Sequence, residues 1–227
     1  MAVEKVKAGK LTFYFGIEQG TQEWLDLRVG RVTCSNALTL LTRGKEFCKE
    51  ANLLSAERTT PNGNGYAERG HVIEDEARNA LNAQLEKSGY KLVTCAFITH
   101  DDFPDAGYSP DGLIVPINLE DWWNYGEFTP AEFKAYNDVT ERQGEGGQKV
   151  LVRTDKHKKA AESLDNVPLV ARCQCQMEML MCDASECFLI LANPDATGDE
   201  PKIAHHIVKR DEKLCQRIAD KLTGKIK

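Results

Sequence analysis

Ser109-Pro110-Asp111-Gly112 and, further along, Glu132-Phe133-Lys134 are the two stretches that decide the fold and chemistry of this chain. Asp111 and Glu132 supply hard carboxylate oxygens, which are the ligands that Mg²⁺ and Mn²⁺ prefer. Glu132 and Lys134 are two residues apart, so on a strand they point to one face while Phe133 points into the core. The pattern therefore predicts a metal site made by two carboxylates and the Phe133 carbonyl, with the Lys134 ammonium beside it.

The same residues also have a plainer interpretation. Pro-Asp-Gly is favourable turn chemistry, and a Glu and a Lys two apart on an edge strand form an exposed pair that contributes only about 0–1 kcal/mol. Short motifs of this kind also occur by chance. The interpretation of this pattern as a metal-dependent nuclease site therefore needs support from the rest of the chain.

The composition is that of a folded, water-soluble protein. The chain has 227 residues, of which 41% are hydrophobic and 28% charged. No apolar run approaches the roughly 20 residues needed to span a bilayer, and residues 1–10 contain no apolar signal segment. The net charge of −6 argues against indiscriminate nucleic-acid binding but leaves room for a local basic channel.

Eight cysteines raise the question of a metal cluster, above all Cys173, Cys175, Cys182 and Cys187. Cys173 and Cys175 lie in a segment with helical periodicity, where residues two apart point about 200° away from each other. There is no C-x-x-C pair. We therefore expect reduced, mostly buried thiols in a cytoplasmic protein.

Hydrophobic periodicity and turn residues predict a mixture of helices and strands. We expect helices at 21–28, 35–41, 66–87, 168–183 and 211–223. We expect strands at 90–99, 129–136, 186–193 and 203–209, and a strand with a turn in it within 107–115. Ser35 is the expected N-cap of the second helix, and 141–148 is expected to be a flexible loop. The first three strands predict an antiparallel meander that carries the candidate site. Residues 1–227 are predicted to form a single α/β domain, with a central mixed sheet flanked by helices on both faces.

Several segments together resemble the lambda exonuclease, or YqaJ-like viral recombinase, family of the PD-(D/E)xK nuclease superfamily. Besides the two stretches above, the matching segments are Glu18-Gln19-Gly20, Trp24, Leu27 to Gly30, Thr33-Cys34-Ser35, Gly70 to Arg78, Gln174 to Met179 and His206 to Glu212. They follow the order of the family over nearly the whole chain. The resemblance implies a restriction-endonuclease-like fold.

The resemblance also implies roles for individual residues. Asp111 and Glu132, with the Phe133 carbonyl, resemble the metal ligands, and Lys134 resembles the catalytic lysine. Glu74 matches an acidic residue that helps to bind metal or orient water, although its spacing to Arg78 also suits a helix ion pair. Gln174 matches a glutamine that supports the lysine and the nucleophile. The 5′ phosphate of a DNA end would be held by Arg28, Ser35 and Ser109.

The activity that the resemblance implies is digestion of double-stranded DNA from the 5′ end, which leaves a 3′ single strand for recombination. The implied cofactors are two Mg²⁺ ions, with Mn²⁺ as a substitute. The implied partners are DNA ends, a single-strand annealing protein and further copies of the chain in a ring-shaped homotrimer, in the cytoplasm of a bacterial host of the phage and without a membrane. An endonuclease on the same scaffold and a non-catalytic DNA-end binder are the alternatives.

Some residues remain open between two interpretations. Arg43 in a turn with Gly44, and Lys149 and Arg153 in a basic stretch, are candidate contacts to the DNA backbone or ordinary solvated charges. Trp122 and Trp123 lie in the long spacer between Asp111 and Glu132, and they suit either base stacking or a subunit interface.

Overall fold

The computed structural model describes residues 4–57, 65–136, 139–143, 149–196 and 202–226, and the side chains of these residues except 55–73 and 139–153. Its centre is a five-stranded mixed sheet in the order β12-β11-β8-β7-β4. These strands are β4 (Tyr90–Val93), β7 (Gly112–Pro116), β8 (Thr129–Ala135), β11 (Glu186–Ala192) and β12 (Ile203–Lys209). β8 and β11 are parallel, and the other neighbours are antiparallel. The predicted α/β class with a central mixed sheet is thus confirmed.

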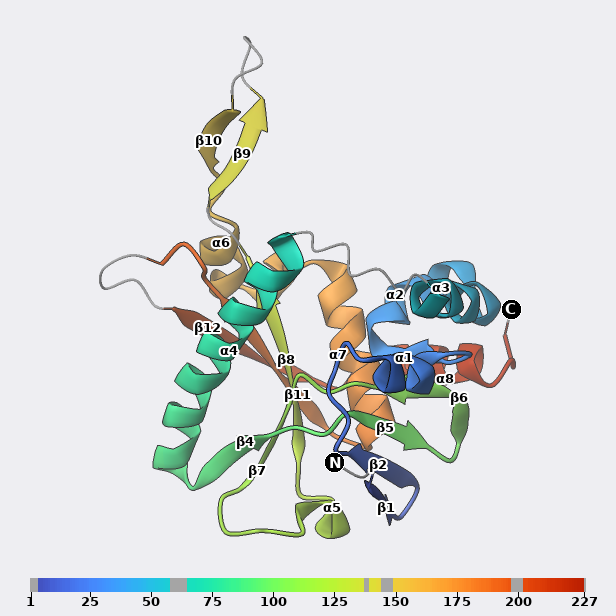
Figure 1. Cartoon of the computed structure of the whole chain (residues 1–227). Helices are drawn as coiled ribbons and strands as arrows, with labels where there is room; N and C mark the ends of the chain where they lie inside the picture. Colours follow the sequence, from blue (N-terminus) through green and yellow to red (C-terminus); the bar gives the residue numbers. More distant parts are fainter. Residues whose placement is uncertain (1–3, 58–64, 137–138, 144–148, 197–201, 227) are drawn as a thin grey trace.

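Helices cover both faces of this sheet (Figure 1). Helix α4 (Gly65–Leu85) lies on one face, where Ala77 and Leu81 pack with Phe133 and Ile190. Helix α7 (Leu169–Cys182) lies on the other, where Met179 packs with Leu189. Because side chains alternate along β8, Phe133 faces α4, and Glu132 and Lys134 face away from it.

A second five-stranded sheet, in the order β1-β2-β5-β6-β3, was not predicted. Its strands are β1 (Glu4–Ala8), β2 (Leu11–Phe15), β3 (Val32–Thr33), β5 (Phe97–His100) and β6 (Phe103–Tyr108). The segments predicted at 90–99 and 107–115 are each divided between the two sheets. The predicted antiparallel pairing is confirmed for their parts β4 and β7 and for β8, whereas β5 and β6 belong to the second sheet. At Ala96 the chain crosses over, and its N–H donates to the Tyr14 carbonyl of β2 at 2.8 Å.

The second crossing between the sheets is the motif Ser109-Pro110-Asp111 itself. Ser109 follows the last residue of β6, and Asp111 precedes the first residue of β7. Pro110 has no N–H to donate to a ladder, which suits it to a break between strands. Gly112 has no positive φ. A Cβ there would lie 2.7 Å from the Leu92 side chain, so close packing and not a turn requires the glycine.

Helix α7 is packed between the two sheets. Cys173, Met177 and Met181 belong to the core on the side of the second sheet, whereas Cys175 and Met179 belong to the core against β11. A helix buried on all sides is expected to be apolar all round. The polar residues of α7 therefore need hydrogen-bond partners or a function; they are Arg172, Gln174, Gln176 and Glu178.

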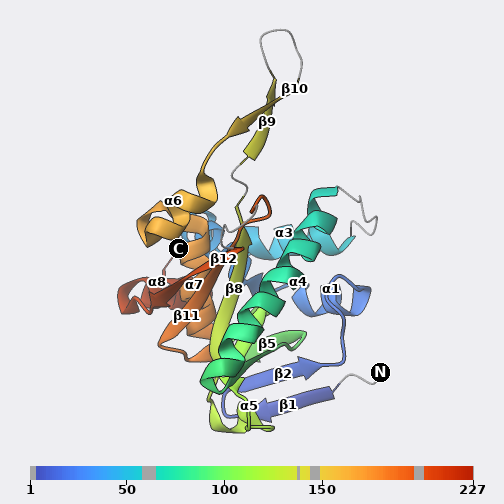
Figure 2. The ribbon, with the colours of Figure 1, turned by 90° about the vertical axis from the view of Figure 1, so that its left-hand side faces the viewer.

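The smaller helices surround this frame (Figure 2). Thr21 caps α1 (Gln22–Arg28), as the predicted start at 21 suggests. The 3₁₀ turn η1 (Cys34–Asn36) precedes α2 (Ala37–Arg43), so Ser35 lies inside the turn and is not the N-cap of the helix. The remaining helices are α3 (Lys45–Glu57), which was not predicted, α5 (Trp122–Tyr125), α6 (Lys156–Glu162) and α8 (Glu212–Leu222), together with the 3₁₀ turns η2 (Glu86–Ser88) and η3 (Leu164–Asn166). No helix in the described part of the chain is long and apolar enough to cross a membrane.

A two-stranded hairpin, β9 (Val139–Gln143) and β10 (Lys149–Arg153), projects from the body (Figures 1 and 2). The flexible loop predicted at 141–148 is therefore wrong at 141–143, and 144–148 lie outside the described residues. Val150 and Val152 at alternate positions of β10 favour a strand, but the Gly-Glu-Gly-Gly run before it dominates the sequence signal.

Trp122 belongs to the hydrophobic core of the protein, a position that the sequence did not predict. Trp122 is 4% exposed and packs edge-on against Phe13 and Phe128, with ring centroids 5.4 Å apart in each case.

We expect Trp122→Ala to lower the free energy of unfolding by about 3–5 kcal/mol, since the substitution leaves a large cavity in the core. Tyr125→Ala, on the same short helix but 65% exposed, should change it by no more than about 0.5 kcal/mol. Equal chemical-denaturation curves for the two variants would contradict a core role for Trp122.

Candidate active site

One cavity of about 300 Å³ brings together all nine residues predicted for metal binding, catalysis and phosphate binding. These are Arg28, Ser35, Glu74, Ser109, Asp111, Glu132, Phe133, Lys134 and Gln174. They come from α1, η1, α4, the β6–β7 crossing, β8 and α7. The cavity therefore lies where the two sheets and the central helix meet.

The carboxylate half of the cavity is built on β8. Glu132 and Lys134 point to one side and form an ion pair in which Glu132 is only 1% exposed. The Phe133 N–H donates to Asp111 Oδ2 at 3.1 Å, which fixes the Asp111 carboxylate against the strand. Glu74 reaches the cavity from α4 and also pairs with Arg78 at 3.3 Å, so the predicted helix ion pair and the cavity position are both present.

These acids destabilise one another. Burial, then the negative charges of Glu132 and Glu74, raises the pKa of Asp111 well above its usual value. Burial, then the charge of Glu178 on α7, likewise raises the pKa of Glu132. Burial tends to lower the pKa of Lys134, but attraction to Glu132 and Asp111 outweighs it, so the ammonium form is favoured.

The donor set fits a divalent cation. Glu132 Oε2 is buried and accepts no hydrogen bond from the amide, ammonium or hydroxyl groups of the described residues. Mutually repelling carboxylates beside a free carboxylate oxygen are what a hard ion such as Mg²⁺ or Mn²⁺ would stabilise. Asp111, Glu132, Glu74 and the Phe133 carbonyl are the groups available to hold it.

This repulsion leads to a stability prediction for Asp111→Asn. In EDTA we expect the substitution to raise the free energy of unfolding by about 0.5–2 kcal/mol, because an amide of equal size removes a buried charge and still accepts from the Phe133 N–H. Added Mg²⁺ should raise the melting temperature of the unsubstituted protein by binding the folded state, and should do so much less in the variant. Asp101→Asn, at an exposed ion pair with Lys7, is the control. A lower free energy of unfolding for Asp111→Asn than for the unsubstituted protein in EDTA would contradict a destabilising repulsion at Asp111.

The other half of the cavity is cationic and hydroxyl-rich. The Arg28 guanidinium lies over the Trp24 ring at 4.3 Å and donates to Ser109 Oγ and Thr33 Oγ1, both at 3.5 Å. Trp24 Nε1 also donates to Ser109 Oγ, at 3.0 Å. Ser35 Oγ is exposed and 3.1 Å from Thr33 Oγ1.

Arg28 has only neutral partners in these contacts, and no carboxylate among the described residues pairs with it. Burial lowers the pKa of its guanidinium, which still remains charged at neutral pH. A partly buried cation ringed by hydroxyl groups is suited to a phosphate, to which a guanidinium can donate two parallel hydrogen bonds.

Of the three predicted DNA-backbone contacts, only Arg43 has a described side chain, and it does not line this cavity. Arg43 is exposed at the end of α2, with its guanidinium 4.7 Å from the centre of the Phe47 ring. Lys149 and Arg153 lie on β10, and their side chains are outside the described part. Lys45, which the sequence places in the same turn as Arg43, binds Asp105 at 2.9 Å and the Leu222 carbonyl at 3.1 Å.

Sequence reasoning missed two residues that organise the site. Trp24 contacts both Arg28 and Ser109, and Glu178 accepts a hydrogen bond from Gln174 Nε2 at 3.0 Å. Trp24 lies one helical turn before Arg28, and Glu178 one turn after Gln174. Both therefore have a sequence signal in their four-residue spacing to a predicted site residue.

The mixed sheet and the central helix thus bring Asp111, Glu132 and Lys134 to one cavity, as the sequence resemblance implies. Comparison with solved structures confirms the resemblance at the level of the fold. The alkaline exonuclease LHK-Exo from Laribacter hongkongensis is similar over 90% of both chains, with 20% identity and a TM-score of 0.59. The structure of LHK-Exo in complex with dAMP is similar over the same shares, with 19% identity and a TM-score of 0.61. No protein-family model and no curated protein matches the sequence.

Proposed function

We propose that this protein is a divalent-metal-dependent exonuclease that degrades double-stranded DNA from its 5′ end and leaves a 3′ single strand. The observation that carries the proposal is the single cavity in which a carboxylate–lysine set adjoins an arginine–hydroxyl set. The first set suits phosphodiester hydrolysis and the second suits a terminal phosphate. Fold similarity to an alkaline exonuclease supports the same conclusion.

The metal-binding half would hold two Mg²⁺ ions, or Mn²⁺ in their place, through Asp111, Glu132, Glu74 and the Phe133 carbonyl. Bound ions of this kind lower the pKa of a coordinated water and stabilise negative charge on a reacting phosphate. The Lys134 ammonium, held by Glu132, orients the attacking water and adds positive charge beside the scissile phosphate. Gln174 reaches the cavity from α7, where it supports Lys134 and the nucleophile.

The arginine–hydroxyl half would decide which end is degraded. Arg28, Ser35 and Ser109 bind the 5′ phosphate, so the bond that enters the metal site lies at a fixed place from the 5′ terminus. Arg43, Lys149 and Arg153 would contact the backbone of the duplex outside the cavity. Such contacts lower the apparent dissociation constant without reading sequence.

The biological setting we propose is recombination by single-strand annealing, with a single-strand annealing protein as partner. A ring-shaped homotrimer around the DNA would make digestion processive, because the duplex could not leave between cuts. The cytoplasm of a bacterial host of the phage is the proposed location.

The test compares linear duplexes that carry 5′-phosphate or 5′-hydroxyl ends with a covalently closed circle, each in Mg²⁺ and in EDTA. We expect Mg²⁺-dependent release of nucleotides from the 5′-phosphorylated linear DNA and no cutting of the circle. Persistent cutting of the circle would assign the protein to the endonucleases of the same fold. Binding of DNA ends with no metal-dependent product would leave a non-catalytic end-binding protein.

A further inference from the structure

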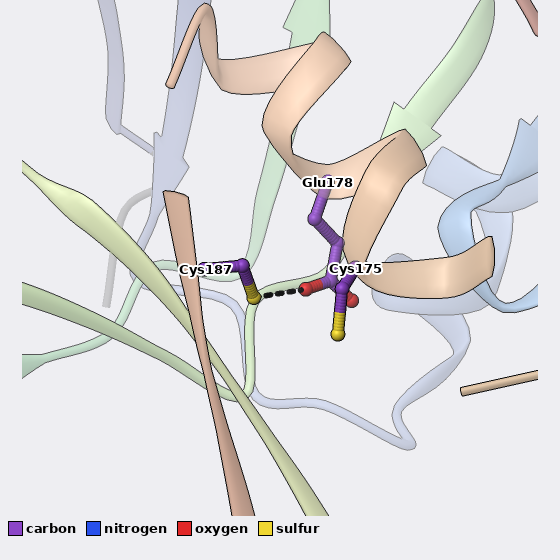
Figure 3. A group of neighbouring side chains, drawn as sticks. All are labelled: Cys175, Glu178 and Cys187. Atoms are coloured by element: carbon purple, nitrogen blue, oxygen red, sulfur yellow. Dashed lines mark hydrogen bonds between the residues drawn. The ribbon is translucent and has the colours of Figure 1, made fainter. Parts of the chain in front are cut away.

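Two features adjoin the residues of the cavity without being needed for the proposed hydrolysis. One is the group of Cys175, Glu178 and Cys187, whose potential ligand atoms lie within 4.8 Å of one another (Figure 3). The Cys187 thiol lies 3.5 Å from Glu178 Oε2, and Gln174 Nε2 donates to Glu178 Oε1 at 3.0 Å. All three members of the group are buried and none lines the cavity, so they have no access to DNA. The other feature is Trp24, which does line the cavity.

Trp24 contacts two of the three residues that we assign to the 5′ phosphate. It lies one helical turn before Arg28 on α1, and this spacing brings both side chains to one face of the helix. The Arg28 guanidinium lies 4.3 Å from the centre of the Trp24 ring, and the Trp24 Nε1–H donates to Ser109 Oγ at 3.0 Å. One side chain thus joins helix α1 to the crossing between the two sheets.

The Trp24 ring holds the arginine without using any of its hydrogen-bond donors. A guanidinium donates in its own plane, so a ring over its face leaves the N–H groups at its edge available. A carboxylate would hold Arg28 as well, but it would occupy those N–H groups and compete with a phosphate. A cation–π contact is therefore a support that an anion pocket can use without losing capacity.

The Trp24 N–H in turn decides how the Ser109 hydroxyl is used. An indole N–H can only donate, so Ser109 Oγ accepts from it, and it also accepts from Arg28 Nη1 at 3.5 Å. A hydroxyl oxygen has two lone pairs and one proton. With both lone pairs engaged, the proton is left to donate, and the hydrogen bonds of the described residues include no acceptor for it. An oxygen of a bound phosphate would be such an acceptor.

We propose that Trp24 is a positioning residue of the 5′-phosphate pocket, an inference that rests on the proposed function. Its ring holds the Arg28 guanidinium by the face, and its N–H leaves the Ser109 hydroxyl as a donor to the phosphate. Trp24 does not itself bind the phosphate, because its single N–H is engaged with Ser109. It therefore determines how strongly the protein prefers phosphorylated ends, and not whether the protein hydrolyses DNA.

The test measures the dissociation constants of 5′-phosphorylated and 5′-hydroxyl duplexes in EDTA, and kcat/KM for both in Mg²⁺. Trp24→Phe keeps a ring beside Arg28 and removes the N–H, so we expect it to reduce the preference for phosphorylated ends by about 2–10-fold. Trp24→Leu removes both contacts and should reduce the preference by about 10–50-fold. On 5′-hydroxyl ends neither variant should have a large effect, because there is no phosphate to hold.

Two comparisons isolate the positioning role. In a Ser109→Ala background, Trp24→Phe should have no further effect, because the N–H acts through the Ser109 hydroxyl; an undiminished effect there would overturn this role of the N–H. Phe47→Leu is the matched control, since Arg43 lies 4.7 Å from the centre of the Phe47 ring but outside the cavity. It should leave the preference unchanged, and a loss as large as that in Trp24→Leu would overturn a role specific to the pocket.

An unchanged preference in Trp24→Leu by both measurements would overturn the positioning role and leave the proposed function intact. Equal weakening of both kinds of end, with a lower melting temperature, would also overturn it, because Trp24 would then only support α1. If Trp24→Leu does not fold, Trp24→Phe and the Ser109→Ala background carry the test. If the unsubstituted protein does not digest DNA, or digests it with no preference for phosphorylated ends, the proposed function or its phosphate pocket fails, and the positioning role fails with it.

Discussion

Lys134→Ala is expected to slow DNA hydrolysis by about 10²–10⁴-fold, the range for loss of a group that assists proton transfer or orients a nucleophile. Lys134 is the ammonium paired with Glu132 inside the cavity. Its loss removes positive charge beside the scissile phosphate and leaves the contacts of the Arg28 half in place. The effect should therefore appear in the single-turnover rate constant, with the affinity for DNA ends little changed.

The chain offers a matched control in Lys209, which forms the same kind of lysine–glutamate pair, with Glu186, on the exposed edge of the sheet. Exposed pairs contribute about 0–1 kcal/mol, so Lys209→Ala should digest DNA at the normal rate. Rates for Lys134→Ala close to those of Lys209→Ala would exclude Lys134 from the chemistry. Melting curves of both variants would separate a catalytic defect from unfolding.

Arg28→Ala is expected to remove most of the preference for 5′-phosphorylated over 5′-hydroxyl ends. Hydrogen bonds to a charged group contribute about 1.5–3 kcal/mol, which corresponds to roughly a 10–100-fold loss in kcat/KM on phosphorylated DNA. On 5′-hydroxyl DNA the same substitution should have little effect, because there is no phosphate to lose. The measurement is kcat/KM for both ends with both proteins, so that the coupling between the guanidinium and the phosphate is obtained directly.

Arg43 provides the comparison, since its guanidinium also lies over an aromatic ring but outside the cavity. If Arg43 contacts the DNA backbone, Arg43→Ala should weaken binding to both kinds of end equally and reduce its dependence on salt. If Arg28→Ala lowers kcat/KM equally on 5′-phosphorylated and 5′-hydroxyl DNA, Arg28 acts as a backbone contact. The phosphate pocket would then have to lie elsewhere.

The long, regular elements could be predicted from the sequence, and the path of the chain between the sheets could not. Strong periodicity and capping residues place α4, α7 and α8 to within about two residues, the usual margin at helix ends. The run at 107–115 contains a turn at Ser109-Pro110-Asp111, but nothing in the pattern of either run shows that its two ends belong to different sheets. The strands β1 and β2 and the helix α3 were not predicted, because their segments are short or strongly polar.

The candidate site was predictable where chemistry dictates the residue type. A carboxylate pair with a lysine two residues on is informative because strand alternation alone brings Glu132 and Lys134 to one face. Glu178 was not predictable in the same way, because its hydrogen bond with Cys187 joins α7 to β11, and sequence spacing does not show contacts between separate elements. The core position of Trp122 was not predicted, since an aromatic pair suits a core, a base stack and an interface equally well.

The crossing at Ser109-Pro110-Asp111 fixes the distance between the two halves of the cavity. Ser109 belongs to the arginine–hydroxyl half and Asp111 to the carboxylate half, and a single proline separates them. In the proposed exonuclease, the length of DNA between the bound 5′ terminus and the cleaved bond would therefore depend on how the two sheets pack against each other through α7. We expect substitutions at this seam, for example of Met177, to broaden the size distribution of the released fragments before they abolish their release.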